Sequence, residues 1–506
     1  MVARQKWGSR WAFVLAAVGS AAGLGNAWRF PYMAYSNGGG AFYVPYFIAL
    51  FLVGIPLLMA EFAIGQGLQS SAPKSMAIIR KNAEFIGWFA VIGGAIITFY
   101  YNVIMAYIFN YLYYSFGVAW KDDPNGFFFG KFLQVSSGPG ELGSIRWPIV
   151  IGLALTWLWI YFILRKGTTS VGKTVAWTVP LPVVLLLILG IRGITLDGAA
   201  KGLNFLFEPN FAKLADPRVW ANAFGQIFFT LSLAFGIMIA YGSYNKKEED
   251  IANNAIITAL GNSATSYLAG IAVFSVLGYM ATQLSVPVDK VVSGGIGLAF
   301  VVYPQAISLF PGGVVVQSII GLLFFLMLLT LGIDSAFSLV EAVEAAASDK
   351  FKVNKKAFLI GFSIFGFLAG LLFSTQGGLY WLDIIDHFVS VYGLLIAGIL
   401  ESIIIGWLFG AEKLRKYINE VSEIKIGKWF NFSIKFLIPA VLIIILGLNF
   451  FDELKKPYGD YPSWALWTGF SMLIITPIIA IILSKIPPKD KDYYKKVEID
   501  LTEGGN

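Results

Sequence analysis

Apolar segments long enough to cross a lipid bilayer recur along almost the whole chain, and they restrict its fold more than any other feature. A membrane-spanning helix needs about 20 mainly apolar residues, because backbone polar groups in hydrocarbon must be hydrogen-bonded within the segment. Twelve such segments lie at 10–35, 40–68, 85–116, 147–165, 171–192, 219–244, 252–282, 314–347, 356–374, 380–409, 432–451 and 463–485. The chain is predicted to be an all-α polytopic membrane protein with about 12 transmembrane helices.

The composition excludes a soluble fold of this length. Of the 506 residues, 57% are hydrophobic and 13% are charged, whereas soluble domains carry about 25% charged residues. Most of the 37 Lys and Arg residues fall on the cytoplasmic side if the N-terminus lies inside the cell. We therefore expect a multi-pass protein of the cell membrane with both termini in the cytoplasm. The net charge of +7 fits contact with the inner leaflet and forms no nucleic-acid-binding stripe.

Catalytic chemistry has few residues to use here. The chain has no Cys and one His, His387, which excludes disulfides, thiolate sites and histidine metal clusters. Since no nucleophile is paired with a suitable base either, an enzyme is the least favoured class.

Charged residues within the apolar segments mark candidate functional positions, because a charge near the bilayer centre costs ~2.5–3.5 kcal/mol on insertion scales. Asp334, in LLTLGIDSAFSL, is the clearest case. With Ser335 beside it, it offers the carboxylate and hydroxyl oxygens that hard cations prefer; the alternative is a protonated Asp that packs two helices. The in-membrane candidates are Arg29, Glu61, Asp334, Asp383, Asp386 and Glu401.

The first and sixth segments contain signs of interrupted helices. VGSAAGLGNAWRFP has three glycines within seven residues, together with Ser20 and Asn26, and each Gly weakens a helix by ~1 kcal/mol relative to Ala. Small residues often serve close packing, but polar neighbours favour an unwound helix whose carbonyls bind cations. QIFFTLSLAFG, at 226–236, repeats the pattern. The spacing of five segments predicts two inverted repeats of five helices.

Five ordered motifs closely resemble the neurotransmitter:sodium symporter family, which includes the bacterial leucine transporter and the animal amine, GABA and glycine carriers. They are GLGNAWRFPY (23–32), NGGGAFYVPY (37–46), GQIFFTLSLAFG (225–236), NSATSYLAG (262–270) and LGIDSAF (331–337). The resemblance covers nearly the whole chain. It implies a sodium-coupled symporter that imports an amino acid.

The resemblance also implies a leucine-transporter-like 5+5 inverted-repeat fold with broken helices 1 and 6. Residues 1–409 would form the transport core, with repeats at about 10–192 and 219–409. Residues 410–485 would form helices 11 and 12, and residues 486–506 a cytoplasmic tail. We expect the KDKDYYKK stretch of this tail to be solvated and disordered.

Two sodium sites follow from the same resemblance. The first would use the carbonyls of Gly19, Ala22 and Leu331 with the side chains of Asp334 and Ser335. The second would use the Ala21 carbonyl, Asn26, Thr230 and Asn262, together with the carboxylate of the substrate. An ion shared in this way couples the binding of sodium and substrate, because neither completes its coordination without the other.

For the substrate, Tyr101 matches the tyrosine whose hydroxyl holds the carboxylate. Amine carriers have an Asp at the position of Gly23, so Gly23 favours an amino acid over a monoamine. The apolar lining favours a neutral, hydrophobic side chain. The implied pocket consists of Ser20, Ala21, Gly23, Ile97, Tyr101, Phe229, Thr230, Ser232, Phe235, Ser335 and Leu339.

Gate residues carry over on both sides of this pocket. Arg29 and Asp386 would close the outer vestibule, with Tyr101 and Phe235 as a thinner lid below. The inner gate would consist of Arg4, Trp7, Ser243, Tyr244 and Asp349. For Arg4 and Asp349, the alternative is an ordinary pair of loop charges.

Chloride is expected to assist transport, since Ser266 stands where chloride-independent bacterial relatives carry an acidic residue. Bound sodium in a low-dielectric core needs a compensating negative charge, either a fixed carboxylate or an anion. The other matching positions are Tyr46, Gln226, Thr230 and Asn262. The alternative is that Ser266 only packs and Asp334 supplies enough charge.

Three other functions stay open at this point: a sodium-coupled amine or osmolyte carrier, a proton-coupled carrier of the same fold, and a channel or substrate sensor. The loop at 117–146 lacks the Cys pair of animal members, which favours a prokaryotic origin.

Overall fold

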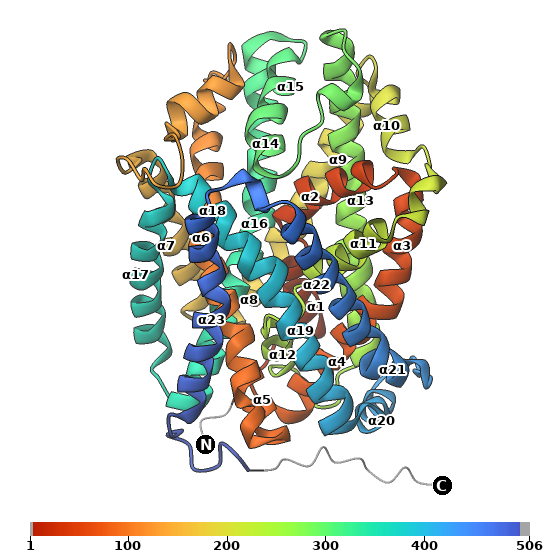
Figure 1. Cartoon of the computed structure of the whole chain (residues 1–506), viewed down its shortest axis with the longest axis vertical. Coiled ribbons are helices and arrows are strands. Elements are labelled where there is room, and N and C mark those ends of the chain that lie inside the picture. Colours follow the sequence, from red (N-terminus) through yellow and green to blue (C-terminus); the bar gives the residue numbers. More distant parts are fainter. Residues whose placement is uncertain (1–3, 496–506) are drawn as a thin grey trace.

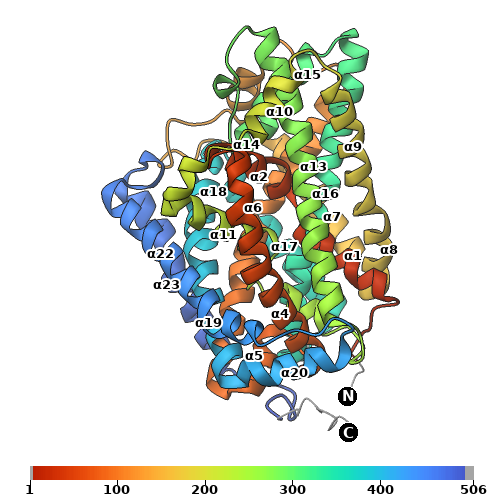
Figure 2. The same ribbon diagram turned by 90° about the vertical axis from the view of Figure 1, so that its right-hand side faces the viewer.

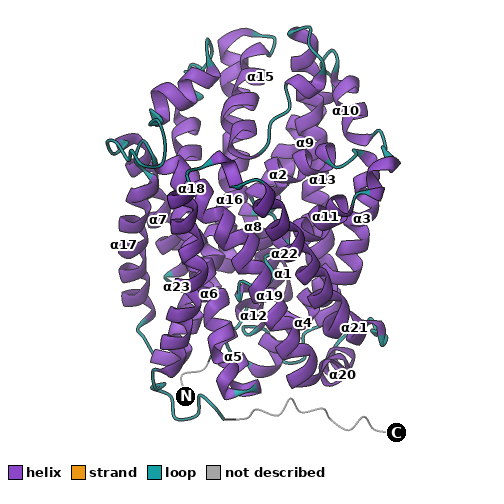
Figure 3. Cartoon of the chain, viewed as in Figure 1, coloured by secondary structure: helices purple, strands orange, loops and turns teal. Residues whose placement is uncertain are grey.

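Helices form nearly all the ordered elements of the computed structural model, which describes residues 4–495 (Figure 3). Within that range there is no named strand, and β pairing is limited to two isolated bridges, Gly39 with Pro209 and Ile145 with Thr375. The helices pack side by side into one bundle (Figure 1). The all-α prediction is confirmed.

The predicted membrane segments are found as helices. By length and composition, ten continuous helical segments of the described chain can cross a membrane, and a pair bent by 52°, α1 (Arg10–Ala21) and α2 (Leu24–Ser36), adds an eleventh. The sixth predicted segment is divided into α11 (Pro217–Thr230) and α12 (Ile237–Gly242), each too short to cross alone. Together they account for the twelve predicted segments.

The remaining α-helices follow in chain order. They are α3 (Tyr43–Ala49), α4 (Ile55–Leu68), α5 (Ala72–Ile79), α6 (Glu84–Tyr114), α7 (Trp147–Leu164), α8 (Thr168–Thr178), α9 (Pro180–Ile194), α10 (Ala199–Phe207), α13 (Ile251–Gln283), α14 (Gly295–Gly297), α15 (Tyr303–Leu309), α16 (Gly313–Phe351), α17 (Lys355–Phe373), α18 (Gly378–Asp386), α19 (Leu394–Ile403), α20 (Ala411–Val421), α21 (Trp429–Phe432), α22 (Ile438–Lys455) and α23 (Ser463–Lys485). Short 3-10 or π turns are η1 (Gly40–Phe42), η2 (Leu50–Gly54), η3 (Lys81–Ala83), η4 (Gly126–Leu133), η5 (Phe211–Ala215), η6 (Val288–Lys290), η7 (Leu298–Val302), η8 (His387–Gly393), η9 (Ile404–Gly410), η10 (Ser433–Leu437) and η11 (Tyr458–Asp460).

Burial separates central from peripheral helices. The most apolar window is 78% buried in α13 but only 17% buried in α23. The helices α17, α22 and α23 lie at the outside of the bundle (Figures 1 and 2), and many of their Leu, Ile and Phe side chains are exposed. Such a surface suits lipid, whereas the central helices are free to position a site.

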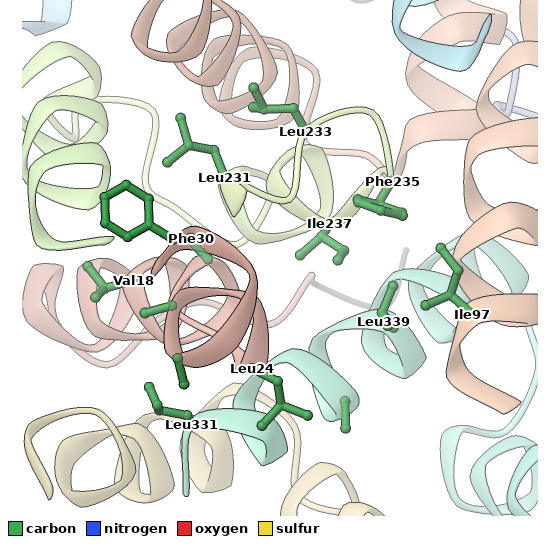
Figure 4. Close-up of a cluster of buried hydrophobic side chains, with 14 of the residues drawn as sticks. Val18, Leu24, Phe30, Ile97, Leu231, Leu233, Phe235, Ile237, Leu331 and Leu339 are labelled. Atoms are coloured by element: carbon green, nitrogen blue, oxygen red, sulfur yellow. The ribbon is translucent and has the colours of Figure 1, made fainter. Parts of the chain in front are cut away.

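The first and sixth segments are interrupted side by side, as predicted. Between α1 and α2, Ala22 and Gly23 leave the helix, and between α11 and α12 the six residues 231–236 are not helical. Ser232 and Ala234 have positive φ, +54° and +60°. In Figure 4 the side chains of both breaks lie around one centre, with Ile97 of α6 and Leu339 of α16 beside them.

One end of the bundle holds both ends of the described chain. Arg4 pairs with Asp349 near the end of α16, and the Lys489 backbone N–H donates to the Lys350 carbonyl at 2.9 Å. We call this the terminal end. The prediction that KDKDYYKK is solvated and disordered is wrong at Tyr493, which is fully buried, whereas Lys489, Lys491, Asp492 and Lys495 are exposed; residues 496–506 lie outside the described range. The division into two inverted repeats stays a prediction.

Candidate functional site

A cavity of about 520 Å³ lies between the two helix breaks, α6 and α16. Among the described residues that line it, none is Asp, Glu, Lys or Arg. Its walls can therefore bind a neutral side chain without burying an unpaired charge. The lining includes every residue predicted to bind the substrate: Ser20, Ala21, Gly23, Ile97, Tyr101, Phe229, Thr230, Ser232, Phe235, Ser335 and Leu339.

Polar groups gather on the break side of this cavity. The Ser20 carbonyl accepts hydrogen bonds from the Ser335 hydroxyl at 3.0 Å and the Ser232 hydroxyl at 2.9 Å. A Cβ atom at Gly23 would lie 2.6 Å from Ser335 Oγ and 3.6 Å from the Tyr101 hydroxyl. That hydroxyl is buried and has no hydrogen-bond partner among the described residues. A buried donor without a partner is available to a bound carboxylate.

Asp334 is buried on α16, where this helix meets α1 and the end of α8. Its Oδ1 accepts a hydrogen bond from Thr178 at 2.8 Å, and a Cβ at Gly19 would lie only 2.5 Å from its Oδ2. Glycine at position 19 therefore lets the carboxylate approach the break directly, which suits a hard cation held by carboxylate and carbonyl oxygen. Sequence reasoning missed Thr178; its only local signal was a hydroxyl residue just before the Pro180 helix start.

A second polar cluster joins the breaks to α13. Asn26 donates to Asn262 Oδ1 at 2.8 Å and to Ser266 Oγ at 2.8 Å. Thr230 donates to Asn262 Oδ1 at 3.2 Å, while Asn26 Oδ1 accepts from the Gly23 backbone N–H at 3.0 Å. The structure thus brings together Asn26, Thr230 and Asn262, although Asn26 and Asn262 are 236 residues apart in the sequence. Three side-chain oxygens are close enough to share one cation.

Around Ser266, hydroxyl and amide donors continue the cluster. Tyr46 is hydrogen-bonded to Ser263 at 3.1 Å, and both Tyr46 and Ser266 are fully buried. The side-chain amide of Gln226 is also buried, and neither its nitrogen nor its oxygen has a partner within the described chain. Ser263 was not predicted, although the NSATS motif contains it.

Glu61 lies against the second helix break, a position that the sequence did not indicate. It lies fully buried on α4, and its Oε1 accepts a hydrogen bond from the Ala234 backbone N–H at 2.8 Å. Ala234 is one of the two non-glycine residues of the second break that have positive φ. Glu61 therefore fixes the non-helical backbone that forms one wall of the cavity.

At the terminal end, Arg4 joins three parts of the chain. Its Nη1 lies 2.6 Å from Asp349 Oδ1, and its Nε donates to Ser243 Oγ at 2.8 Å. Asp349 Oδ2 accepts from the Ser71 backbone N–H at 2.7 Å. Burial disfavours the guanidinium charge, but Asp349, Tyr244 and Glu344 together outweigh this effect and hold the pKa of Arg4 above its usual value.

Aromatic and acidic side chains extend this contact inward. The Trp7 indole donates to the Tyr241 carbonyl at 2.9 Å, and the Tyr244 hydroxyl donates to Glu341 at 2.9 Å. Lys355 also reaches Glu341, at 3.1 Å. All five residues predicted for the inner gate therefore belong to one connected network.

At the opposite end of the cavity, Arg29 and Asp386 are separate. No ion pair joins them within residues 4–495; the Arg29 guanidinium lies over the Phe229 ring at 4.6 Å. Asp386 accepts instead from the Tyr100 hydroxyl at 2.5 Å and from Ser390 at 2.8 Å.

The two remaining candidates lie apart from the cavity lining. Asp383 accepts from the hydroxyls of Tyr458 and Tyr461, at 2.9 and 2.8 Å. Glu401 is buried, and its Oε1 has no partner within the described chain. Neither lines the cavity.

Comparison with known proteins gives consistent matches. The model of the Sodium:neurotransmitter symporter family matches residues 4–125 and 118–487. An uncharacterized sodium-dependent transporter of Methanocaldococcus jannaschii is 43% identical over 96% of this chain and 98% of its own length. A human sodium- and chloride-dependent neutral and basic amino acid transporter is 36% identical (95% and 85%). A bovine sodium- and chloride-dependent GABA transporter is 34% identical (94% and 86%).

Proposed function

Because this chain belongs to the sodium:neurotransmitter symporter family, we propose that it imports a neutral, hydrophobic amino acid together with sodium. Family membership makes it a sodium-dependent, multi-pass membrane transporter and not an enzyme. The observation that carries the proposal is the cavity between the breaks, which joins unpaired polar groups to an uncharged, largely apolar wall.

An amino acid fits both sides of this cavity. Its carboxylate would accept from the unpartnered Tyr101 hydroxyl and lie at the N-terminus of α2, where the helix dipole favours an anion. Its side chain would contact Ile97, Phe235 and Leu339. A charged side chain on the substrate would have no oppositely charged partner in this lining, so a neutral side chain is favoured.

Sodium would bind at two positions. One lies at Asp334, Ser335 and the carbonyls of Gly19, Ala22 and Leu331, where the close approach at Gly19 favours direct coordination. Asn26, Thr230, Asn262 and the Ala21 carbonyl would hold the other, with the substrate carboxylate completing it. Sharing that ion would make sodium and amino acid raise each other's affinity.

Chloride would bind beside the second sodium. The unpartnered Gln226 amide and the hydroxyls of Tyr46, Ser266 and Thr230, with Asn262, supply the donors that a halide needs. If so, replacing chloride with gluconate lowers uptake, and Ser266→Glu restores uptake without chloride by supplying a fixed charge. Uptake that is indifferent to chloride in the unaltered protein leaves Ser266 as a packing residue.

We place the terminal end in the cytoplasm of a prokaryotic cell, in accord with the positive-inside rule and the archaeal relative. The Arg4, Trp7, Ser243, Tyr244 and Asp349 network then closes the inner gate. Arg29 and Asp386 would close the outer one over bound substrate.

The test is uptake of labelled amino acids into proteoliposomes under inward gradients of sodium, potassium or protons. We expect neutral amino acids to enter only with sodium, and Asp334→Asn to remove that uptake because an amide lacks the charge that holds the ion. Asp383→Asn is the matched control, since Asp383 accepts hydrogen bonds from Tyr458 and Tyr461 and from no residue of either helix break. Uptake driven by protons alone, or competition only by amines, contradicts the proposal; downhill flux without coupling indicates a channel.

A further inference from the structure

A second cavity, of about 330 Å³, lies beside the central cavity between the helix breaks, and we call it the side groove. Its walls come from α6, the second helix break, the chain from η8 to α19, and α23. Ile97 and Phe235 line both cavities, and Figure 4 shows these two side chains next to each other. The side groove and the central cavity therefore have a wall in common.

Glycine makes room for the side groove on α6. A Cβ atom at Gly93 would have no other atom within 4 Å. At the adjacent Gly94, by contrast, a Cβ would lie 3.2 Å from Leu339 and 3.8 Å from Phe235, which line the central cavity. Protein interiors are normally close-packed, so open space at Gly93 behind the wall of a binding cavity marks a candidate site for a second ligand.

The side groove can be reached from lipid. Its wall on α23 includes Met472 and Leu473, and α23 lies at the outside of the bundle (Figures 1 and 2). The next two residues, Ile474 and Ile475, are exposed as lipid-facing side chains would be. None of the described lining residues is charged, and apolar cavities bind apolar molecules rather than water.

One polar position interrupts this apolar lining. Thr476 is the single polar side chain among the described residues of the side groove, it is only 4% exposed, and its hydroxyl makes no hydrogen bond within the described chain. Pro477 follows it inside α23 and has no N–H, so the Leu473 carbonyl lacks its usual helical donor. Unpaired polar groups are costly at this depth in a membrane. A hydrocarbon chain would fill the groove without pairing them, whereas a molecule with one hydroxyl group would do both.

We propose that the side groove binds an apolar alcohol, that is, a hydrocarbon with one hydroxyl group, which reaches it from the lipid. The hydroxyl pairs with Thr476 and the Leu473 carbonyl, and the hydrocarbon packs against Gly93. A bound molecule supports Ile97 and Phe235 from behind and so stabilises the wall of the central cavity. Binding in the groove is independent of the proposed function; only the effect on substrate rests on it.

Binding is tested directly by photolabelling, which needs neither sodium nor substrate. The full-length protein in lipid is irradiated with an octanol that carries a diazirine, and mass spectrometry locates the label. We expect saturable labelling of the α6 and α23 residues that line the groove. At equal concentrations in the membrane, 1-octanol should displace the label roughly fivefold better than octane, because octane makes no hydrogen bond.

Two variants and a control test the assignment to the groove. Gly93→Leu fills the space and should reduce labelling by roughly tenfold or more. Gly447→Leu on α22 is the matched control, since a Cβ there also has no atom within 4 Å, and it should leave labelling unchanged. Thr476→Val keeps the volume and should make 1-octanol no better than octane, so it remains a test if thermal unfolding shows that Gly93→Leu does not fold.

Equal labelling of folded Gly93→Leu and Gly447→Leu overturns the site, and equal displacement by 1-octanol and octane in the unaltered protein overturns its preference for a hydroxyl group. The effect on substrate is measured as the Kd of a labelled neutral amino acid in sodium. We expect 1-octanol to lower this Kd by roughly threefold, and Gly93→Leu to show the lower Kd without alcohol. A Kd that neither changes would overturn the coupling between the cavities. No sodium-dependent binding at all would contradict the proposed function, while labelling would still decide whether the groove is a site.

Discussion

The two ends of the central cavity differ in how their charges are used. At the terminal end, Arg4 and Asp349 are joined at 2.6 Å, with side chains only 17% and 13% exposed. At the opposite end, Arg29 lies over an aromatic ring, and Asp386 accepts hydrogen bonds from two hydroxyl groups. In this state an ion pair therefore closes the terminal end, whereas among the described residues no ion pair joins Arg29 to Asp386 at the opposite end.

The comparison teaches that the two gates need not be equally strong. A nearly buried pair with several further hydrogen bonds is costly to break, because each partner left alone is a buried charge. A solvent-exposed pair contributes about 0–1 kcal/mol and opens readily. Substitutions at the terminal end should therefore change the resting population much more than substitutions at the opposite end.

Asp349→Ala should give the largest effect. The substitution leaves the Arg4 charge without its partner, which costs about 3 kcal/mol and corresponds to roughly a 100-fold shift toward the open terminal end. The reporter is a Ser338→Cys variant of this Cys-free chain, since Ser338 is fully buried on α16. The rate at which a hydrophilic thiol reagent, added at the terminal end, labels this cysteine measures the shift. Asp452→Ala, which breaks the exposed Arg218–Asp452 pair, is the control; similar rates in both variants would erase the difference between a buried and an exposed pair.

Glu341→Gln should have a smaller effect at the same end. Tyr244 and Lys355 both donate to this carboxylate, and an amide weakens these charge-assisted bonds by about 1.5 kcal/mol. We expect labelling of the reporter to rise about tenfold. A rate equal to that of Asp349→Ala would mean that Glu341, rather than the Arg4 pair, holds this end closed.

Arg29→Gln should barely change the resting state. Its contact with the Phe229 ring contributes about 0.5–1 kcal/mol, so labelling at the terminal end should change by less than about fivefold. Substrate release should become faster, because closure of the opposite end over the substrate would lack the guanidinium charge of Arg29. The dissociation rate of a labelled amino acid in sodium measures this; a large rise in reporter labelling would contradict the comparison.

The smallest effect should come from acidification. Against partial burial, a backbone N–H and two neighbouring lysines, Lys74 of α5 and Lys352 just after α16, hold the pKa of Asp490 below its usual value. A lowered pKa means that the stabilisation is present above the unfolded value of about 3.9 and is lost as pH falls through the folded value. The small difference in labelling between the unaltered protein and Asp490→Asn should therefore shrink as pH falls below about 4 and vanish once pH lies below the folded pKa of Asp490. A difference that grows on acidification would exclude this carboxylate as its source.

Much of the architecture could be predicted from the sequence, because hydrocarbon requires long apolar helices and polar residues within them are conspicuous. The breaks were visible from the glycines and from Ser20 and Asn26, and the family motifs supplied the lining of the cavity. Contacts between distant segments carried no such signal. Thr178 also donates to the Thr174 carbonyl in its own helix, so its sequence resembles an ordinary helical threonine.

The contacts of Glu61 and of residues 489–495 could not be predicted from the sequence for the same reason. As a buried acid, Glu61 was an obvious candidate, but its partner is a backbone N–H 173 residues away. The KDKDYYKK stretch is polar enough to be solvated, and its composition does not indicate a contact with Glu84. The fold brings Tyr493 within hydrogen-bond distance of Glu84, which lies 409 residues away in the sequence. Composition describes what a segment prefers in isolation, whereas these contacts depend on what the rest of the chain presents to it.

The break between α11 and α12 has a consequence for how the protein is made. Helices of 14 and 6 residues cannot each span the bilayer, and the peptide groups between them would be costly in lipid. The hydrogen bond from Ala234 to Glu61 and that from Ser232 to Ser20 satisfy groups of this stretch, and both partners belong to spans synthesised earlier. When the sixth span is synthesised, its hydrogen-bond acceptors Glu61 and Ser20 are therefore already part of the chain. The broken conformation depends on packing against these earlier spans and not on insertion into lipid alone.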